Sequence, residues 1–206
     1  MLNDEPVRAI YLVKFYTKFF KHDQYTILTS AFIYLRLDLF DIYDKQLPYV
    51  AKIYKDHINY YILKGVEFQR KNDYEKAISI LNEGIELTGD SADAYNNRGY
   101  YSLLLGDFEN ALHDFNKAIE INAKLYFAYN NRGLAKIKLN DESGINDIRK
   151  SLKGFENNAM GYKNLALWEF HFGDKSRIPK ILAKCKRRAY YVDIKEEVAE
   201  LEELLI

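Results

Sequence analysis

The sequence YNNRG occurs twice, at residues 95–99 and 129–133, so the two copies lie 34 residues apart. Each copy contains two Asn and one Gly, which have low helix propensity, within a segment whose apolar spacing is otherwise helical. An identical phrase at a fixed interval is typical of a structural repeat. The interval therefore serves to align the rest of the chain.

The match at this interval extends far beyond the five residues. The recurring positions are an aromatic residue, a glycine, a capping Asp and a small residue in a second apolar run. They are filled by Tyr61, Tyr95 and Tyr129, by Gly65, Gly99 and Gly133, by Asp73 and Asp107, and by Ala77 and Ala111. In the third copy, the second apolar run is GINDIRKSL at 144–152. It aligns with ALHDFNKAI at 111–119 after one residue is removed from the turn. A fourth copy follows, with Tyr162, Ala166, Gly173, Asp174, Leu182 and Cys185 in the corresponding places.

Within one copy, apolar residues recur at steps of three and four on either side of Gly106 and Asp107. A Gly commonly ends a helix, and an Asp caps the start of the next. Each copy is therefore predicted to be two antiparallel helices joined by a tight turn. Gly99 and Gly133 each cost about 1 kcal/mol relative to Ala inside a helix. We expect this cost to be offset because a residue without a side chain lets the second helix approach closely.

This order of aromatic, small residue, Gly-Asp-aromatic turn and Ala over 34 residues resembles the tetratricopeptide repeat. The resemblance implies an all-α fold, a right-handed superhelical stack of antiparallel helix pairs with a C-terminal capping helix. It covers residues 58–188 as four repeats, at about 58–91, 92–125, 126–158 and 159–188. The Pro that usually ends each repeat is missing. Pro179 is expected to make the last second helix begin a residue or two late.

Residues 1–57 lack the strict period but have helical patterns. The sequence DEP at 4–6 suits a helix start, and Asp23 suits the cap of a helix that carries Ile27, Ser30, Ala31 and Tyr34 on one face. The segment 41–55 parallels 72–86, with Tyr43 under Tyr74 and Val50 under Leu81. We interpret it as a degenerate repeat, and chance is the alternative.

Residues 189–206 are predicted to form the capping helix. Their apolar residues recur at alternating steps of three and four, at Tyr191, Ile194, Val198, Leu201 and Leu205. This stripe would cover the apolar face of the final repeat. A coiled-coil dimer would use the same stripe but needs three or four heptads, whereas this run spans barely two. We therefore expect a monomer.

Composition favours an ordered protein without nucleic-acid binding. The chain is 48% apolar and 15% aromatic, with three Pro and 30 basic against 30 acidic residues. A general nucleic-acid binder usually has a basic surplus. No apolar stretch is long enough to predict membrane insertion. The single Cys185 and a start without a secretory pattern lead us to expect a cytoplasmic location.

The resemblance also implies where a ligand would bind, because the first helix of each repeat lines the concave face of such a stack. A peptide or helix of another protein is the expected partner. The candidate groove residues are Asn96, Asn97, Tyr100, Phe127, Asn130, Asn131, Leu134, Met160, Lys163, Asn164, Leu167, Phe170 and His171. The aromatic and aliphatic residues among them suit an apolar or amphipathic segment.

One row of this groove is polar. Asn97, Asn131 and Asn164 recur at the same place in three repeats, although Asn in a helix interior costs about 0.6 kcal/mol relative to Ala. A carboxamide both donates and accepts, which suits gripping the main chain of an extended peptide. The alternative is that these amides bond neighbouring repeats to one another. Family members that clamp a terminal carboxylate have Lys or Arg beside such Asn, whereas apolar residues stand here.

A second open question is the occupant of the groove. The protein's own N-terminal helices, which contain Phe15, Phe19, Phe20 and Phe32, would also fit it. The basic run KCKRR at 184–188 could serve RNA or an acidic partner, and a solvated helix end is the simpler interpretation.

Enzyme signatures are missing from the sequence. The four His have no metal-ligand spacing, Cys185 has no partner Cys and is expected to be a buried small residue, and no Gly-rich phosphate loop occurs. We therefore predict no enzyme activity, no metal and no cofactor. The predicted function is a non-catalytic protein–protein interaction module, an adaptor or scaffold. The alternative is a dedicated chaperone or inhibitor of a single client, of the secretion-chaperone or toxin-immunity type.

Overall fold

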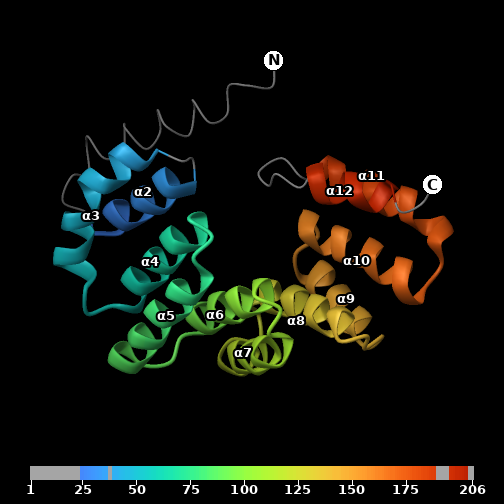
Figure 1. Cartoon of the computed structure of the whole chain (residues 1–206), viewed down its shortest axis with the longest axis horizontal. Helices are drawn as coiled ribbons and strands as arrows, with labels where there is room; N and C mark the ends of the chain where they lie inside the picture. Colours follow the sequence, from blue (N-terminus) through green and yellow to red (C-terminus); the bar gives the residue numbers. More distant parts are fainter. Residues whose placement is uncertain (1–23, 37–38, 189–194, 204–206) are drawn as a thin grey trace, which may run out of the picture. The chain divides into compact units, whose positions relative to one another are not determined.

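A computed structural model describes residues 24–36, 39–188 and 195–203. Within these ranges the chain consists of helices, turns and loops, with no strand. The all-α class and the stacking of antiparallel helix pairs are confirmed. The chain divides into two compact units between Asp90 and Ser91, and each is described by itself (Figure 1).

The first unit contains two helix pairs. They are α2 (Gln24–Arg36) with α3 (Phe40–Tyr54), and α4 (Ile58–Arg70) with α5 (Tyr74–Thr88). The first pair packs around Ala31, Tyr43 and Val50, which are fully buried. Residues 41–55 thus form a helix that buries the two residues aligned with the repeat. Phe32 packs against this same core, whereas Phe15, Phe19, Phe20, Asp23 and the predicted start at 4–6 lie outside the described residues.

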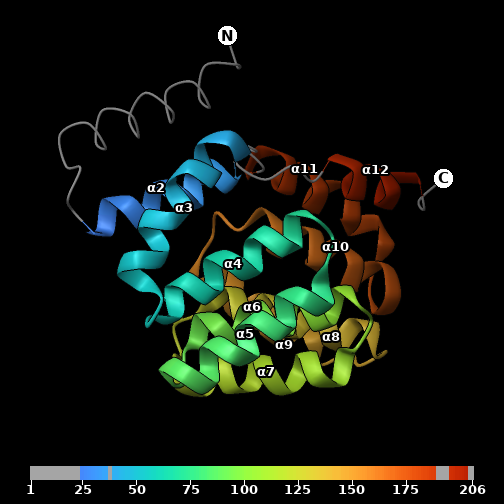
Figure 2. The ribbon, with the colours of Figure 1, turned by 60° about the vertical axis from the view of Figure 1, so that its left-hand side comes forward.

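The second unit contains three helix pairs and a final helix. The pairs are α6 (Ala92–Leu104) with α7 (Phe108–Ile121), α8 (Tyr126–Lys138) with α9 (Gly144–Gly154), and α10 (Ala159–Phe172) with α11 (Ile178–Arg188); the final helix is α12 (Lys195–Glu203). Each first helix also packs on the next first helix, so α6, α8 and α10 follow one another within the stack (Figures 1 and 2). The precise division of the chain into repeats stays a prediction.

The predicted turns between the two helices of a pair share one backbone conformation. Asn72, Gly106 and Asn140 occupy the same place in three successive turns and have φ of 56°, 82° and 60°. This left-handed region is open to Gly and tolerated by Asn, which explains why only these two residue types occur there. The next residue is Asp in all three turns. Asp73 and Asp107 cap the following helices at 3.0 and 3.2 Å, whereas Asp141 accepts from Ser143 N before α9, at 2.9 Å.

The helical glycines permit a close approach, as predicted. A Cβ on Gly133 would lie 2.9 Å from the Gly144 carbonyl oxygen and 2.8 Å from a side-chain carbon of Ile148, both on α9. A Cβ on Gly99 would lie 2.9 Å from the Phe115 ring. The lost helix propensity is therefore offset by tighter packing of the two helices of a repeat.

The last helix pair departs from the others at its turn. A short 3-10 helix, Lys175–Arg177, follows Asp174, and α11 begins only at Ile178. By contrast, α7 begins directly after Asp107, so the delay before Pro179 is larger than the residue or two predicted. Proline fits the first turn of a helix, where its missing N–H is not needed.

The C-terminal capping helix is confirmed for its described part. Val198 and Leu201 of α12 are buried in one cluster with Ala166, Leu182 and Cys185 of the last pair. Cys185 is fully buried, as predicted, and its thiol contacts the Ala159 carbonyl oxygen at 3.2 Å. Tyr191, Ile194 and Leu205 of the predicted stripe lie outside the described residues.

Candidate functional site

The candidate groove residues lie on the three first helices of the second unit, α6, α8 and α10. Their exposure differs widely. Asn130 and Asn164 are buried, with 3% and 0% of their surface exposed, whereas Asn97 and Asn131 are half-buried. The predicted Asn row is therefore not a uniform surface.

Neighbouring first helices are joined by bonds between amide side chains. Asn131 Nδ2 donates to Asn96 Oδ1 at 3.0 Å, between α8 and α6. Asn164 Nδ2 donates to Asn130 Oδ1 at 3.1 Å, between α10 and α8. The two bonds are the same contact repeated, because an Asn of one repeat meets the residue before its counterpart in the preceding repeat. Of the two roles considered, contact between repeats is the one these distances display.

The first member of the row has a different bond. Asn97 Nδ2 donates to the Asp93 carbonyl oxygen of its own helix at 2.7 Å. Asn97 Oδ1 and Asn131 Oδ1 accept no hydrogen bond from the described residues, and both side chains are half-buried. These two carbonyls thus keep capacity for a ligand.

The fully buried amide has an unmet acceptor. Among the described residues, nothing donates to Asn164 Oδ1, which is shielded from solvent. An unpaired buried acceptor costs about 1–3 kcal/mol. The amide bond between α8 and α10 therefore leaves one buried acceptor, Asn164 Oδ1, without a donor among the described residues.

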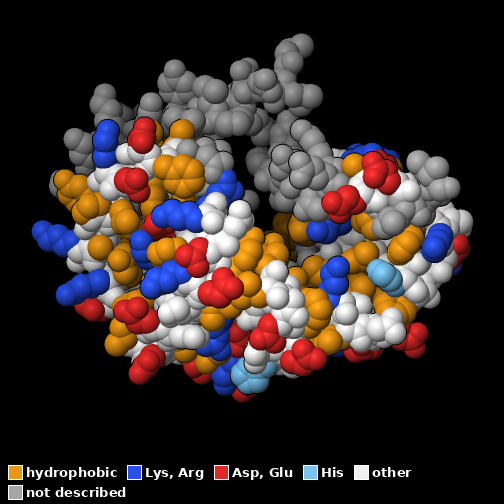
Figure 3. Space-filling model, in the orientation of Figure 1, with side chains coloured by type: hydrophobic (Ala, Val, Ile, Leu, Met, Phe, Trp, Pro, Cys, Tyr) orange, Lys and Arg blue, Asp and Glu red, His pale blue; other side chains and the backbone are white. Residues whose placement is uncertain are grey.

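Apolar candidates flank the amides and are only partly covered. Tyr100 and Leu134 pack against the cluster around Phe115 and Leu103. Met160, Leu167 and Phe170 pack against the cluster of α10, α11 and α12. All five remain half-buried, so each contributes to a core and still presents surface. Both apolar and polar side chains are visible over α8 and α10 in Figure 3.

Phe127 differs from these five apolar residues because its side chain is more exposed. Its side chain is 50% exposed and meets the Phe155 ring edge-on, with centroids 5.4 Å apart. Phe155 follows α9 and is 41% exposed. Phe127 therefore forms an exposed aromatic pair with the loop after α9.

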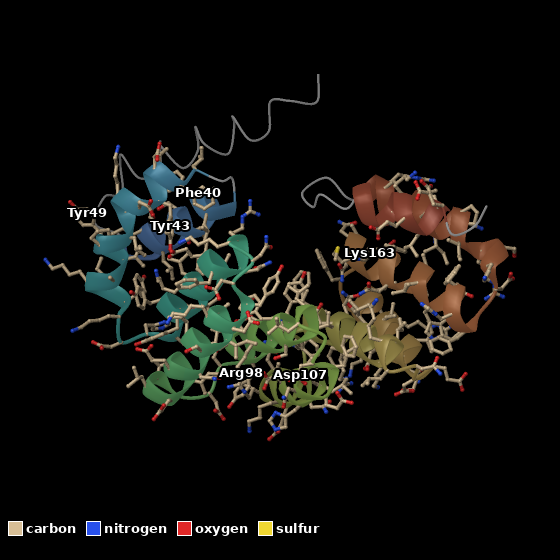
Figure 4. The ribbon with its side chains drawn as sticks, viewed as in Figure 1. Phe40, Tyr43, Tyr49, Arg98, Asp107 and Lys163 are labelled. Carbon is tan, nitrogen blue, oxygen red and sulfur yellow. The ribbon has the colours of Figure 1, made fainter. Side chains whose placement is uncertain are left out.

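Lys163 and His171 are the ionisable candidates. Lys163 is half-buried and projects from α10, at the place that Asn96 and Asn130 hold in earlier repeats (Figure 4). His171 is exposed and contacts the rings of Phe170 and Phe172. The exposed imidazole thus lies at the carboxyl end of α10, beside the apolar candidates.

Sequence reasoning missed the ion pairs that join the two helices of a repeat. Arg98 in α6 donates twice to Asp114 in α7, at 2.7 and 2.6 Å (Figure 4). Arg132 in α8 does the same to Asp147 in α9, at 2.9 and 2.6 Å. The Arg of YNNRG is therefore structural, and a two-pronged guanidinium–carboxylate bond fixes the geometry of each pair.

These pairs are shielded enough to shift protonation. Burial raises the pKa of Asp147, but hydrogen bonds from Arg132 and Lys136 outweigh that effect, so its pKa lies below the ordinary value. The bond to Asp114 raises the pKa of Arg98. The Asp147 carboxylate thus remains charged at neutral pH and acts as a structural link.

The first unit has a related contact at Glu67. This buried carboxylate accepts from Tyr43 at 3.0 Å and from Lys64 and Lys71 at 2.6 and 2.7 Å. Burial raises the pKa of Glu67, but the two lysines and Tyr43 outweigh that effect and lower it. The bond from Tyr43 joins α3 to α4, so the degenerate pair is tied to the first regular repeat.

The other described histidines, His57 and His113, have structural or surface positions. His57 caps α4 through Asn59 N, and His113 is an exposed residue beside Asp114. No group of three or more His, Cys, Asp or Glu among the described residues could hold a metal ion. His22 lies outside them.

Comparison with known proteins identifies the repeat. Models of the tetratricopeptide repeat match residues 58–91 and, directly after them, residues 92–125. Residues 58–125 of the chain are thus tetratricopeptide repeats. The resemblance inferred from YNNRG is thereby confirmed, and tetratricopeptide repeats make this chain a protein-interaction module of a generally non-catalytic kind. Curated protein sequences give no significant match.

Several solved structures share the fold. The chain is similar to PilW, a widely conserved type IV pilus biogenesis factor, with a TM-score of 0.68 and 15% identity over 98% of this chain and 92% of that one. PilF of Pseudomonas aeruginosa has a TM-score of 0.67 and 14% identity, over 88% and 90%. YrrB, a tetratricopeptide repeat protein with an unusual peptide-binding site, has 0.56 and 11%, over 93% and 97%. At these identities the likeness concerns the fold.

No helix in the described ranges is long and apolar enough to cross a membrane.

Proposed function

We propose that this protein is an adaptor or scaffold that holds an extended peptide or a helix of a partner protein on its first helices α6, α8 and α10. One observation carries the proposal. The half-buried amides of Asn97 and Asn131 keep unused acceptors, and half-buried apolar side chains flank them on the same helices. Such amides can form hydrogen bonds with the main chain of a bound segment, and the apolar side chains beside them can contact its apolar residues. Both features suit an extended or amphipathic segment.

The proposal divides the Asn candidates between two roles. Asn97 and Asn131 are assigned to the ligand, because their acceptors are accessible. Asn130 and Asn164 are assigned to contacts between repeats, because both are buried. The peptide-binding site of YrrB supports the proposal as an example of such binding on the same fold. The cytoplasm is the proposed location.

The test is a selection of peptides from a random library on the purified full-length chain, followed by affinity measurements. Replacing Asn97 and Asn131 by Ala removes two hydrogen bonds of about 1 kcal/mol each. We expect the dissociation constants of selected peptides to rise about thirtyfold. Circular dichroism checks that helicity is retained.

Two controls separate ligand contact from loss of structure. Asn96→Ala breaks the same bond to Asn131 but leaves the Asn131 amide in place, so affinity should be nearly retained. Glu109→Ala with Asn146→Ala changes exposed residues of the second helices and should have no effect. If Asn96→Ala weakens binding as much as the double variant, or if the library yields no binder, the proposal is wrong.

A further inference from the structure

Two positions on the second helix of each repeat change charge along the chain. In register, they are Glu83 and Glu86 in α5, Lys117 and Glu120 in α7, Lys150 and Lys153 in α9, and Lys184 and Arg187 in α11. The pair is thus acidic in α5, mixed in α7 and basic in both α9 and α11. We call Lys150, Lys153, Lys184 and Arg187 the basic row, and all four are exposed.

Only part of the basic row stabilises its own helices. In α7 the same spacing brings Lys117 Nζ within 3.7 Å of Glu120, an attractive pair. In α9 and α11 it places like charges three residues apart, which repel each other. Lys153 and Arg187 lie in the last turns of α9 and α11, where the helix dipole favours a cation. Lys150 and Lys184 lie before the last turn, so a helix-stabilising role leaves these two residues unexplained.

Two carboxylates near the row are engaged with other cations. Among the described residues, Lys153 and Arg187 have no acidic partner. The neighbouring carboxylates Glu202 and Glu156 pair with Lys186 at 2.8 Å and with Arg188 at 3.2 Å, outside the row. The positive charge of the row is thus available to a partner.

Lys150 and Lys184 each make a cation–π contact. Their ammonium groups lie 4.2 Å from the Tyr129 ring and 5.9 Å from the Tyr162 ring. These are equivalent positions in successive repeats. The contact orients the two ammonium groups, and both residues remain exposed.

The row is compact enough for one short ligand. Both α9 and α11 pack on α10, and packed helices lie about 8–10 Å apart, so the two outer helices are separated by at most about 20 Å. An extended segment of about six residues spans that distance. Residues 144–188 contain 11 Lys and Arg but only 4 Asp and Glu, so the charge extends beyond the row itself.

We propose that the basic row binds an acidic segment of a partner protein, a short stretch rich in Asp and Glu. The site lies on the second helices, so it is distinct from the proposed peptide face on α6, α8 and α10. Charge complementarity supplies the attraction, and the regular spacing of the repeats presents the cations at two successive levels.

Two other anionic ligands fit less well. Single-stranded nucleic acid is usually held by exposed aromatic rings, whereas Tyr129 and Tyr162 are buried, with 3% and 8% exposed. A membrane surface is usually bound by a helix with a free apolar face, whereas Ile178, Leu182 and Cys185 of α11 are buried in the core. Both become arms of the test.

The test measures binding of a fluorescent 12-residue peptide of alternating Glu and Ser to the full-length protein at low salt. The informative variant is Lys153→Gln with Arg187→Gln, because these two side chains make no ion pair within the described part of the chain. We expect its affinity to fall about fivefold or more, and the wild-type affinity to fall steeply with added salt.

The matched control is Lys52→Gln with Lys55→Gln, which removes two exposed cations of α3 and its end and changes net charge equally. It should bind like the wild type. Helicity by circular dichroism verifies folding of both variants. Equal loss in both, or no peptide binding at 50 mM salt, would overturn the proposal. So would tighter binding of a 12-nucleotide oligouridylate or of phosphatidylserine vesicles that is lost in the Lys153 and Arg187 variant.

Discussion

The second and third repeats join their two helices through an ion pair, whereas the fourth has apolar residues at the same two positions. Arg98 and Asp114, and then Arg132 and Asp147, are replaced in the fourth repeat by Leu165 and Ile181. The first repeat has Ile80 where the carboxylate would stand and keeps a cation, Lys64, which pairs with Glu67 instead. One backbone arrangement thus accepts either contact, provided that no cation is left without a carboxylate.

The same comparison applies to the small residue that follows. Gly133 of the third repeat lies against the backbone of α9, whereas the fourth repeat has the buried Ala166 at that place. The fourth pair therefore accommodates one more carbon atom between its helices. Its late second helix and the 3-10 turn before it belong to the same departure from the strict pattern.

The largest expected effect comes from breaking one ion pair. Asp114→Ile leaves Arg98, which is 20% exposed, without its carboxylate, and the loss of one partner of a shielded pair costs about 3 kcal/mol. Adding Arg98→Leu makes the second repeat resemble the fourth and should restore most of that stability. Urea unfolding followed by circular dichroism measures both. A double variant as unstable as the single one would show that the two kinds of contact are not interchangeable.

The next effect concerns the small position. Gly133→Ala should lower the free energy of unfolding by about 2 kcal/mol, because the new Cβ meets the Gly144 carbonyl oxygen and overpacking exceeds the gain of about 1 kcal/mol in helix propensity. Ala166→Gly, the reverse change in the fourth repeat, should lose about 1 kcal/mol. Thermal unfolding of the two variants compares them. A stabilised Gly133→Ala would contradict the close approach.

The amide bonds should differ by burial. Asn130→Ala leaves the Asn164 amide buried without a partner and should cost about 1–2 kcal/mol. Asn96→Ala removes the equivalent bond at a half-buried place and should cost less, because solvent can replace it. Urea midpoints of the two variants test the ranking. Equal losses would mean that burial does not distinguish the two bonds.

The smallest effect appears only in acid. The pKa of Asp147 is lowered in the folded state, so its contribution is complete above the ordinary value of 3.8 and is lost as the pH falls through the lowered pKa. Stability should therefore decline below about pH 4. A variant with Arg132→Leu and Asp147→Ile should decline less between pH 5 and 3. Urea unfolding at each pH gives the free energy of unfolding of both proteins. If this free energy declines equally in both, the loss of stability in acid does not come from Asp147.

Much of the fold could be predicted from the sequence, because the period itself encodes it. The 34-residue interval located the turns, and Gly99 and Gly133 indicated where the helices touch. The ion pairs were also within reach, since Arg98 and Arg132 occur only in the copies that have Asp114 and Asp147. That correlation within one chain is a signal from which the ion pairs can be predicted.

The detailed site could not be predicted in the same way. Alignment places Asn97, Asn131 and Asn164 in one row, but Asn131 bonds to Asn96 rather than to Asn97. This offset of one residue depends on how far one helix slides along its neighbour, which periodicity does not reveal. The burial of Asn130 and the pairing of Phe127 with Phe155 depend on the same detail of packing.

The most direct test of the central claim is hydrogen–deuterium exchange of the full-length chain with and without a peptide selected from the library. If the first helices present the binding face, the peptide should slow exchange in α6, α8 and α10 and leave α7 and α9 unchanged. Slowed exchange confined to the second helices, or to the first unit, would contradict the account.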